Sequence, residues 1–231
     1  MPKKLSLRLE KIASFVPEGC YLGDVGSDHA LLPIHLLLRK KITYALAIEN
    51  KMGPYLRMKS AIEDAGLTNR AFCLLSDGIS KLNEGVDVLA LCGMGGLLAC
   101  KILEAHPENL SGIKTIIIDP HRDLRAVRKR VSALHYHIVD EAIVHEDKID
   151  YVILRFDEGD PKRPYSEEDL LFGPILRYKR EESYLAWLAK QKRAVSDILN
   201  KELSKSAREG YLTLYRMIDK EIKRDLSPKR P

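Results

Sequence analysis

The sequence predicts an α/β fold built on a largely parallel sheet, followed by a smaller unit that is entirely helical. Three observations lead to this prediction. Up to about residue 157 of the 231, short apolar runs alternate with amphipathic stretches, as strands alternating with helices do. A segment with closely spaced glycine and proline, 157–164, is then typical of a linker. Beyond it, apolar residues recur only at helical spacing.

The predicted strands are short apolar runs bounded by polar residues or glycine. They cover residues 20–25, 44–48, 71–75, 86–91, 115–118, 135–144 and 151–156. Amphipathic stretches predict helices over residues 6–15, 29–39, 54–65, 97–106 and 124–134. Alternating strands and helices imply parallel strands with helices on both faces of the sheet. The last two predicted strands form a hairpin, which adds an antiparallel edge.

Five strand–helix units closed by a hairpin match the seven-stranded, Rossmann-like sheet of class I methyltransferases, whereas a dehydrogenase domain more often ends after six parallel strands. From residue 174 the apolar spacing predicts two antiparallel helices in a coiled-coil hairpin, with a break at or just before Glu209-Gly210. We therefore expect two domains, a ligand-binding sheet domain at 1–157 and a helical hairpin at 158–231.

The composition indicates a globular protein of a reducing compartment. Hydrophobic residues make up 45% and charged residues 31%, which excludes a wholly disordered chain. The net charge of +5 permits a polyanionic partner without requiring one. The 4 cysteines lack C-x-x-C spacing, and no signal peptide or apolar run long enough to span a bilayer is visible. A cytoplasmic location is expected.

Candidate functional residues follow the predicted strands at their carboxyl ends, where ligands bind in such folds. The first loop reads Gly23-Asp24-Val25-Gly26-Ser27-Asp28-His29-Ala30. Gly26 permits close approach of the backbone to a ligand. The loop lacks the G-x-G-x-x-G pattern, which disfavours NAD and FAD and leaves other adenosine-bearing cofactors open. A tight turn with Asp28 as a helix cap is the alternative interpretation.

Acidic residues follow the second and third predicted strands. Glu49 lies about 20 residues beyond Gly26, where a carboxylate can accept hydrogen bonds from both hydroxyls of a ribose. Asp77, within Ser76-Asp77-Gly78, can accept a hydrogen bond from the exocyclic amine of an adenine. An Asp-Gly turn that binds nothing has the same sequence.

Glycine-rich and polar segments follow the fourth and fifth predicted strands. Gly93-Met94-Gly95-Gly96 holds three glycines in four residues, which costs conformational entropy and suggests close approach by another molecule. Met94 is placed to cover an adenine or a target base. In Asp119-Pro120-His121, the histidine can contact a base or a phosphate, and Asp119 can equally cap a helix.

Taken together, these segments resemble the bacterial tRNA (adenine-22 N1)-methyltransferase family. The resemblance covers essentially the whole chain and rests on Leu5-Ser6-Leu7-Arg8-Leu9, the Asp24–Ala30 loop, Leu32-Pro33, Gly53-Pro54, Ser76-Asp77-Gly78, Gly93-Met94-Gly95-Gly96 and Phe172-Gly173-Pro174. One segment departs from the pattern. The family tends to carry Gln-Pro-Asn where this chain has Asp119-Pro120-His121.

The resemblance implies S-adenosylmethionine as methyl donor, tRNA as acceptor and no metal. The implied cofactor-binding residues are Asp24, Gly26, Ser27, Asp28, His29, Glu49, Asp77, Gly78, Gly93 and Met94. The residues expected to bind the tRNA are Arg8, Gly95, Gly96, His121, Arg122 and Arg125. Asp28 is the expected catalytic residue, because the loop after the first predicted strand reaches the reaction centre, where a carboxylate would stabilise the positive charge that develops on methylation or take the proton of the amine.

Basic residues are expected to bind phosphates, although a solvated helix face accounts for each cluster equally well. They gather in the predicted helix after the fifth strand and in the helical tail. The first cluster contains Arg122, Arg125, Arg128, Lys129 and Arg130.

Two other function classes remain open from the residues. A metal-dependent phosphoesterase would use Asp24, Asp28, His29, His35, Asp119 and His121 as ligands, because separate strand ends converge in a parallel sheet. A non-catalytic RNA-binding protein could retain a methyltransferase shell, but Glu49 and the intact glycine loop argue against a decayed cofactor site. The oligomeric state, monomer or homodimer, is left open.

Overall fold

The computed structural model describes residues 5–82 and 84–224. It divides into two compact units, one ending at Ile175 and the other beginning at Leu176. The outermost residues of the two expected domains, 1–4 and 225–231, lie outside the described residues, as does residue 83.

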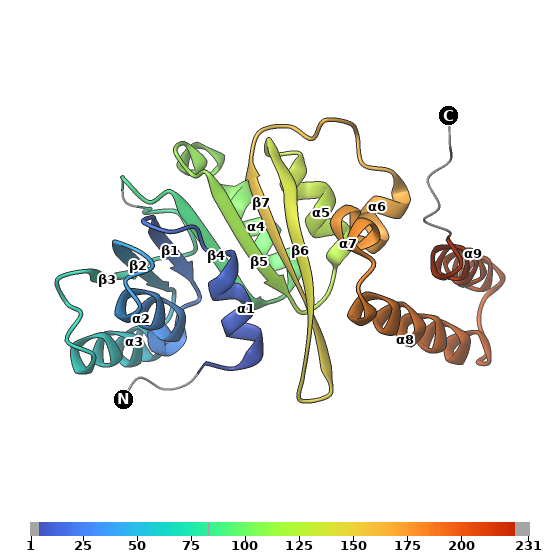
Figure 1. Cartoon of the computed structure of the whole chain (residues 1–231), viewed down its shortest axis with the longest axis horizontal. Coiled ribbons are helices and arrows are strands. Elements are labelled where there is room, and N and C mark those ends of the chain that lie inside the picture. Colours follow the sequence, from blue (N-terminus) through green and yellow to red (C-terminus); the bar gives the residue numbers. More distant parts are fainter. Residues whose placement is uncertain (1–4, 83, 225–231) are drawn as a thin grey trace. The chain divides into compact units, whose positions relative to one another are not determined.

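In the described part of the chain, seven strands form one sheet in the order β3-β2-β1-β4-β5-β7-β6 (Figure 1). Strands β1 to β5 are parallel, and β7 pairs antiparallel with both β5 and β6. The predicted Rossmann-like sheet with an antiparallel edge is confirmed. The strands are β1 (Tyr21–Val25), β2 (Tyr44–Glu49), β3 (Ala71–Leu75), β4 (Val88–Met94), β5 (Thr115–Pro120), β6 (Tyr136–Glu146) and β7 (Ile149–Glu158).

Helices cover both faces of the sheet, because alternate strand residues point to opposite faces and both sets are apolar (Figure 1). Ala47 shares one core with residues of α1, α2 and α3, and the neighbouring Ile48 shares the other with residues of α4 and α5. The helices are α1 (Leu7–Phe15), α2 (Leu31–Leu38), α3 (Met52–Asp64), α4 (Gly96–Ala105) and α5 (Leu124–Ser132).

Shorter helical turns connect these elements. They are η1 (Asp28–Ala30), η2 (Pro107–Leu110), α6 (Glu167–Phe172) and α7 (Pro174–Lys179). The predicted helix 29–39 begins differently from expectation, because His29 and Ala30 both have positive φ angles, 62° and 46°, before α2 starts. Among the described residues, no helix is long and apolar enough to cross a membrane.

The order of the strands reverses at β1. On one side Val25 lies beside Ile48 of β2, and on the other side it lies beside Leu91 of β4. The loop after β1 leads to α2, which packs on one face, and the loop after β4 leads to α4, which packs on the other. Loops that separate in this way leave room between them at the carboxyl ends of the strands, where such folds bind ligands.

A fully buried ion pair joins the last part of the first unit to the sheet. The side chains of Arg128 in α5 and Glu141 in β6 are each 0% exposed, and Nε lies 2.8 Å from Oε1. Arg128 also donates to the carbonyl of Leu170, and Glu141 accepts from the N–H of Ile175. Gly173 is required here, because a Cβ would lie 2.6 Å from both carboxylate oxygens.

The second unit contains the predicted helical hairpin, made of α8 (Glu182–Leu199) and α9 (Lys205–Ile222). The helices run antiparallel, since Tyr184 near the start of α8 donates a hydrogen bond to Glu221 near the end of α9. Glu221 is buried, and its charge is balanced by a group of arginines, Arg177, Arg180 and Arg224.

The break predicted at or just before Glu209-Gly210 lies several residues earlier. The chain turns instead between the end of α8 at Leu199 and the start of α9 at Lys205. Ser204 caps α9, because its hydroxyl accepts a hydrogen bond from the N–H of Ala207. Gly210 lies inside α9, where the packing of the hairpin offsets the low helix propensity of glycine.

Replacing Glu141 by Gln should lower the free energy of unfolding by about 3–5 kcal/mol, because Arg128 would keep a buried charge without a counter-ion. Urea denaturation at pH 7 measures the loss. The matched control is Glu104→Gln, whose partner Arg130 also lies in α5 but whose ion pair is about one third exposed (34% and 36%). That variant should change stability by less than about 1 kcal/mol. Equal losses would contradict the prediction.

Replacing Gly210 by Ala should stabilise the hairpin by about 0.5–1 kcal/mol, since alanine loses less backbone entropy in a helix. There is room for the change, because, apart from the chain neighbours and the backbone of α9 itself, no atom of the described residues lies within 4 Å of a Cβ built at this position. The measurement is the shift in urea midpoint of the full chain. A destabilised variant would show that Gly210 has a conformational role that the helix does not reveal.

Candidate active site

The loop after β1 folds back onto β2 and lies close to Met94 at the end of β4. The N–H of Gly26 donates to the carbonyl of Ile48 at 2.9 Å. Gly26 has a φ of +78°, a conformation that favours glycine, and a Cβ there would lie 3.4 Å from Cε of Met94. The structure thus brings together two loops that the sequence predicted to bind one ligand.

Asp24 is a buried carboxylate at the base of this loop, 7% exposed. Its Oδ2 accepts a hydrogen bond of 2.5 Å from the hydroxyl of Ser27. Burial raises the pKa of Asp24 to about 6, and the negative charge of Glu49 adds to this effect, while the Ser27 hydroxyl opposes it. Asp24 and Ser27 form a unit that shapes the loop.

Asp28, the expected catalytic residue, forms a bidentate ion pair with Arg57 of α3. The guanidinium Nε and Nη2 donate to the two carboxylate oxygens at 3.1 and 3.0 Å. This pairing lowers the pKa of Asp28, so the group is a weak proton acceptor. Both side chains are about half exposed. Arg57 was not among the site residues predicted from the sequence.

Glu49 is the last residue of β2 and is 9% exposed. Burial raises the pKa of Glu49, and the negative charge of Asp28 acts in the same direction. The carbonyl of Glu49 accepts a hydrogen bond from the N–H of Ser76, which fixes the loop after β3 beside it. A carboxylate at this place can accept two hydrogen bonds from a ribose.

The loop after β3 contains an exposed Asp77 and a buried Gly78. Gly78 has a φ of +56°, and a Cβ there would lie 2.7 Å from Cγ2 of Ile102 in α4. Packing against α4 therefore explains this glycine without a ligand.

The glycines after β4 serve different purposes. Gly96 packs tightly, since a Cβ there would lie 2.4 Å from the carbonyl oxygen of Arg122. Gly95 faces open space, because no atom of the part of the chain that the structure describes, chain neighbours apart, lies within 4 Å of a built Cβ. It lines a pocket of about 430 Å³ together with Leu97, Leu98, Arg122 and Asp123. Half-exposed Leu97 and Leu98 give that pocket an apolar wall.

Arg8 of α1 lies at the same edge of the sheet. Its Nη1 donates to Oδ2 of Asp119 at 3.1 Å, and its guanidinium lies 4.8 Å from the centre of the Tyr151 ring. A Cβ at Gly93, where φ is +71°, would lie 3.7 Å from Arg8. The ring of exposed His121 lies 6.4 Å from that of Tyr151. These contacts join α1, β4, β5 and β7.

The basic cluster around α5 is mostly paired within the protein. Arg125 forms a bidentate pair with Glu167, with distances of 2.5 and 2.9 Å. Arg128 is 0% exposed and is paired with Glu141 and the carbonyl of Leu170, so its charge is used within the fold and its assignment to the phosphate-binding cluster is wrong. It lies on the apolar face of α5 with Leu124, Val127 and Val131, and this helical spacing was the available signal. Arg122 is 82% exposed.

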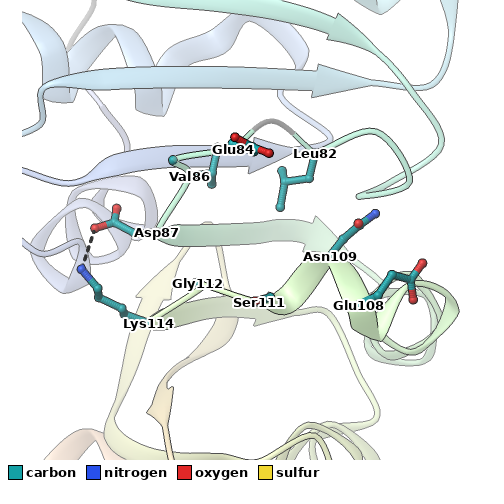
Figure 2. Close-up of a pocket in the computed structure, with 10 residues that line it drawn as sticks. Leu82, Glu84, Val86, Asp87, Glu108, Asn109, Ser111, Gly112 and Lys114 are labelled. Carbon is teal, nitrogen blue, oxygen red and sulfur yellow. Dashed lines mark ion pairs between the residues drawn. The ribbon is translucent and has the colours of Figure 1, made fainter.

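Another pocket lies at the opposite edge of the sheet. Figure 2 shows it at the amino ends of β4 and β5, where Lys114 pairs with Asp87 at 3.6 Å. Its volume is about 520 Å³. Its lining, within the described part of the chain, contains none of the predicted site residues.

The six residues proposed as metal ligands do not assemble into one site. Asp24 accepts from Ser27, Asp28 pairs with Arg57 and Asp119 pairs with Arg8. Among residues 5–82 and 84–224, no three His, Cys, Asp or Glu side chains are grouped so that they could hold a metal ion. The carboxylates are arranged for hydrogen bonding and ion pairing.

Comparison with known proteins shows which family the chain resembles in sequence. Residues 5–154 match the family model described as "Methyltransferase domain". The chain is 34% identical over 187 residues to the tRNA (adenine(22)-N(1))-methyltransferase of Bacillus subtilis (strain 168). The aligned region covers 79% of this chain and 79% of that protein.

Solved structures agree with the sequence comparison. A Streptococcus pneumoniae protein in complex with S-adenosyl-L-methionine has a TM-score of 0.88 and 31% identity, covering 95% of this chain and 100% of that one. The B. subtilis m1A22 tRNA methyltransferase has a TM-score of 0.87 and 28% identity, covering 95% and 99% of the two chains. This chain therefore belongs to the tRNA (adenine-22 N1)-methyltransferase family.

Proposed function

We propose that the protein transfers a methyl group from S-adenosylmethionine to N1 of an adenine in tRNA, at position 22. The observation that carries the proposal is the close approach of the loop after β1 to the end of β4 at the reversal of strand order, where a Cβ built on Gly26 would lie 3.4 Å from Cε of Met94. Membership of the family supports the reaction, the cofactor and the tRNA substrate.

The residues at this edge fit the cofactor by their chemistry. S-adenosylmethionine, when bound, supplies a methyl group activated by a cationic sulfonium. Buried Glu49 would accept hydrogen bonds from the ribose hydroxyls, and exposed Asp77 would accept from the adenine amine. The remaining predicted cofactor residues, Asp24, Gly26, Ser27, Asp28, His29, Gly78, Gly93 and Met94, come from the same strand ends.

The main task of the chain is to hold the two reactants in line. Adenine N1 has a lone pair at neutral pH, so no general base has to create the nucleophile. Positioning at close approach can supply a large share of the rate enhancement. The developing positive charge on the base calls for a carboxylate nearby. That Asp28 is this carboxylate stays a prediction, and its pairing with Arg57 already uses both of its oxygens.

Contacts to the tRNA are proposed for exposed groups beside the site and for the helical hairpin. His121 and Arg122 are exposed, and Gly95 lines a pocket with Arg122. Basic residues of α8 and α9 would add phosphate contacts, which contribute affinity that falls with salt. A cytoplasmic location belongs to the proposal, and the free thiols Cys20, Cys73, Cys92 and Cys100 support it.

The direct test is incubation of the purified protein with labelled S-adenosylmethionine and unmodified tRNA, followed by nucleoside analysis and mapping of the modified position. We expect N1-methyladenosine at position 22. A chelator should leave the activity intact, which separates this function from a metal-dependent phosphoesterase. Salt-dependent tRNA binding with no methyl transfer across a full tRNA set would refute the proposal and favour a non-catalytic RNA-binding protein.

Replacing Glu49 by Gln should raise the dissociation constant for S-adenosylmethionine by roughly 10- to 100-fold, because hydrogen bonds to a charged acceptor are lost. Isothermal titration calorimetry measures the change. The control is Glu63→Gln in α3, since Glu63 is 53% exposed and pairs only loosely with Lys59, at 3.9 Å. Equal affinity of the Glu49 variant and the wild type would remove Glu49 from the cofactor site.

A further inference from the structure

Asp119 is the second-to-last residue of β5. Its two carboxylate oxygens differ in whether they have a hydrogen-bond partner. The side chain is 1% exposed, and Oδ2 accepts from Arg8. Among the described residues, Oδ1 has no hydrogen-bond partner. The backbone N–H of Gly93 approaches the carboxyl and lowers its pKa, and Oδ1 keeps acceptor capacity for a further partner. A buried polar atom without a partner is costly, and a ligand is one way to satisfy it.

Arg8 holds this carboxylate in a defined orientation. Its guanidinium lies over the ring of Tyr151, and its side chain is only 22% exposed. Burial raises the pKa of Asp119, while the positive charge of Arg8 opposes that effect and favours the ionised form. The ion pair uses Oδ2 and leaves Oδ1 available.

Asp119 lies one strand away from the loop that is proposed to hold the cofactor. Cys92 of β4 is its neighbour in the sheet. Ala90, two residues before Cys92 in β4, is the sheet neighbour of Asp24, so the side chains of Asp24 and Asp119 flank β4 on the same face of the sheet. His121, two residues after Asp119, donates its backbone N–H to the carbonyl of Met94 at 3.0 Å. Asp119 is therefore close to Met94 and to the strand ends of the site.

We propose that Oδ1 of Asp119 accepts a hydrogen bond from the exocyclic amine of the target adenine, which makes Asp119 a catalytic residue and Arg8 its positioning residue. This inference rests on the proposed function. Asp119 suits the role better than Asp28, because Asp28 is half exposed and both of its oxygens are bound by Arg57.

The chemistry explains why this contact would speed the reaction. The lone pair of adenine N1 forms the new N–C bond, the C–S bond breaks, and its electron pair stays on sulfur. The positive charge passes to the adenine ring and its amine, and no proton has to leave. A hydrogen bond from the amine to a carboxylate strengthens as that charge develops, so it stabilises the transition state more than the ground state.

The test combines variants of Asp119 with a change in the substrate. Single-turnover rates are measured at saturating S-adenosylmethionine with two unmodified tRNAs, one with adenine and one with purine, which lacks the exocyclic amine, at the target position. In the wild type, loss of the amine should slow methylation by roughly 10- to 100-fold. In Asp119→Ala, the adenine substrate should already be slowed, and loss of the amine should cost less than in the wild type, because the remaining penalty reflects only the lower nucleophilicity of N1 in purine. Asp119→Asn, which keeps a neutral acceptor, should fall between them.

The matched control is Asp157→Ala. Asp157 also pairs with an arginine of the sheet, Arg155, but it lies beside Thr115 at the other end of β5. This variant should respond to loss of the amine as the wild type does. The affinity of all variants for S-adenosylmethionine should stay within about twofold, which shows that the site is folded.

Two results would overturn the inference. One is an equal rate penalty for loss of the amine in the wild type and in both Asp119 variants, and the other is a wild type that methylates both tRNAs at the same rate. A wild type that methylates no adenine in tRNA would instead refute the proposed function itself, so the two failures are distinguishable.

Discussion

The reversal of strand order at β1 is the constraint on which the site depends. Because β1 has β2 on one side and β4 on the other, the loops after β1 and β4 lead to helices on opposite faces of the sheet. The start of the loop after β1 nevertheless lies beside the end of β4, where a Cβ built on Gly26 would be 3.4 Å from Cε of Met94. Residues that are far apart in the sequence are thereby placed around one point, and the backbone can approach a ligand there.

Around that point, the way each carboxylate is paired determines what it can do. Asp24 accepts a hydrogen bond from the Ser27 hydroxyl. Asp28 pairs with a half-exposed arginine, and Asp119 pairs with an arginine that is mostly buried. These pairings differ in the acceptor capacity that they leave. A bidentate pair engages both oxygens and leaves each with one lone pair, whereas the single hydrogen bond to Asp119 leaves Oδ1 without a partner in the described structure. The type and number of acidic residues alone would not distinguish them.

The role of each arginine, like that of each carboxylate, depends on the group with which it is paired. Within one short segment, Arg122 is exposed, Arg125 pairs with Glu167, and Arg128 is enclosed with Glu141. The buried pair connects α5, β6 and the segment up to Ile175, so an arginine that reads as a phosphate contact contributes to the architecture instead. A net charge of +5 is thus a weak guide to a nucleic-acid surface.

The sequence by itself determined the strand–helix alternation, the antiparallel edge, the helical hairpin and the family, because periodicity and local motifs act over a few residues. It also indicated Glu49 and the loops at Gly26 and Gly93, since ligand-binding residues follow parallel strands at their carboxyl ends. Only the tertiary structure decided that Gly78 and Gly96 pack against neighbouring segments and that α9 continues through Gly210. It also decided which acid meets which base. These outcomes depend on contacts between segments distant in the chain, which local patterns do not encode.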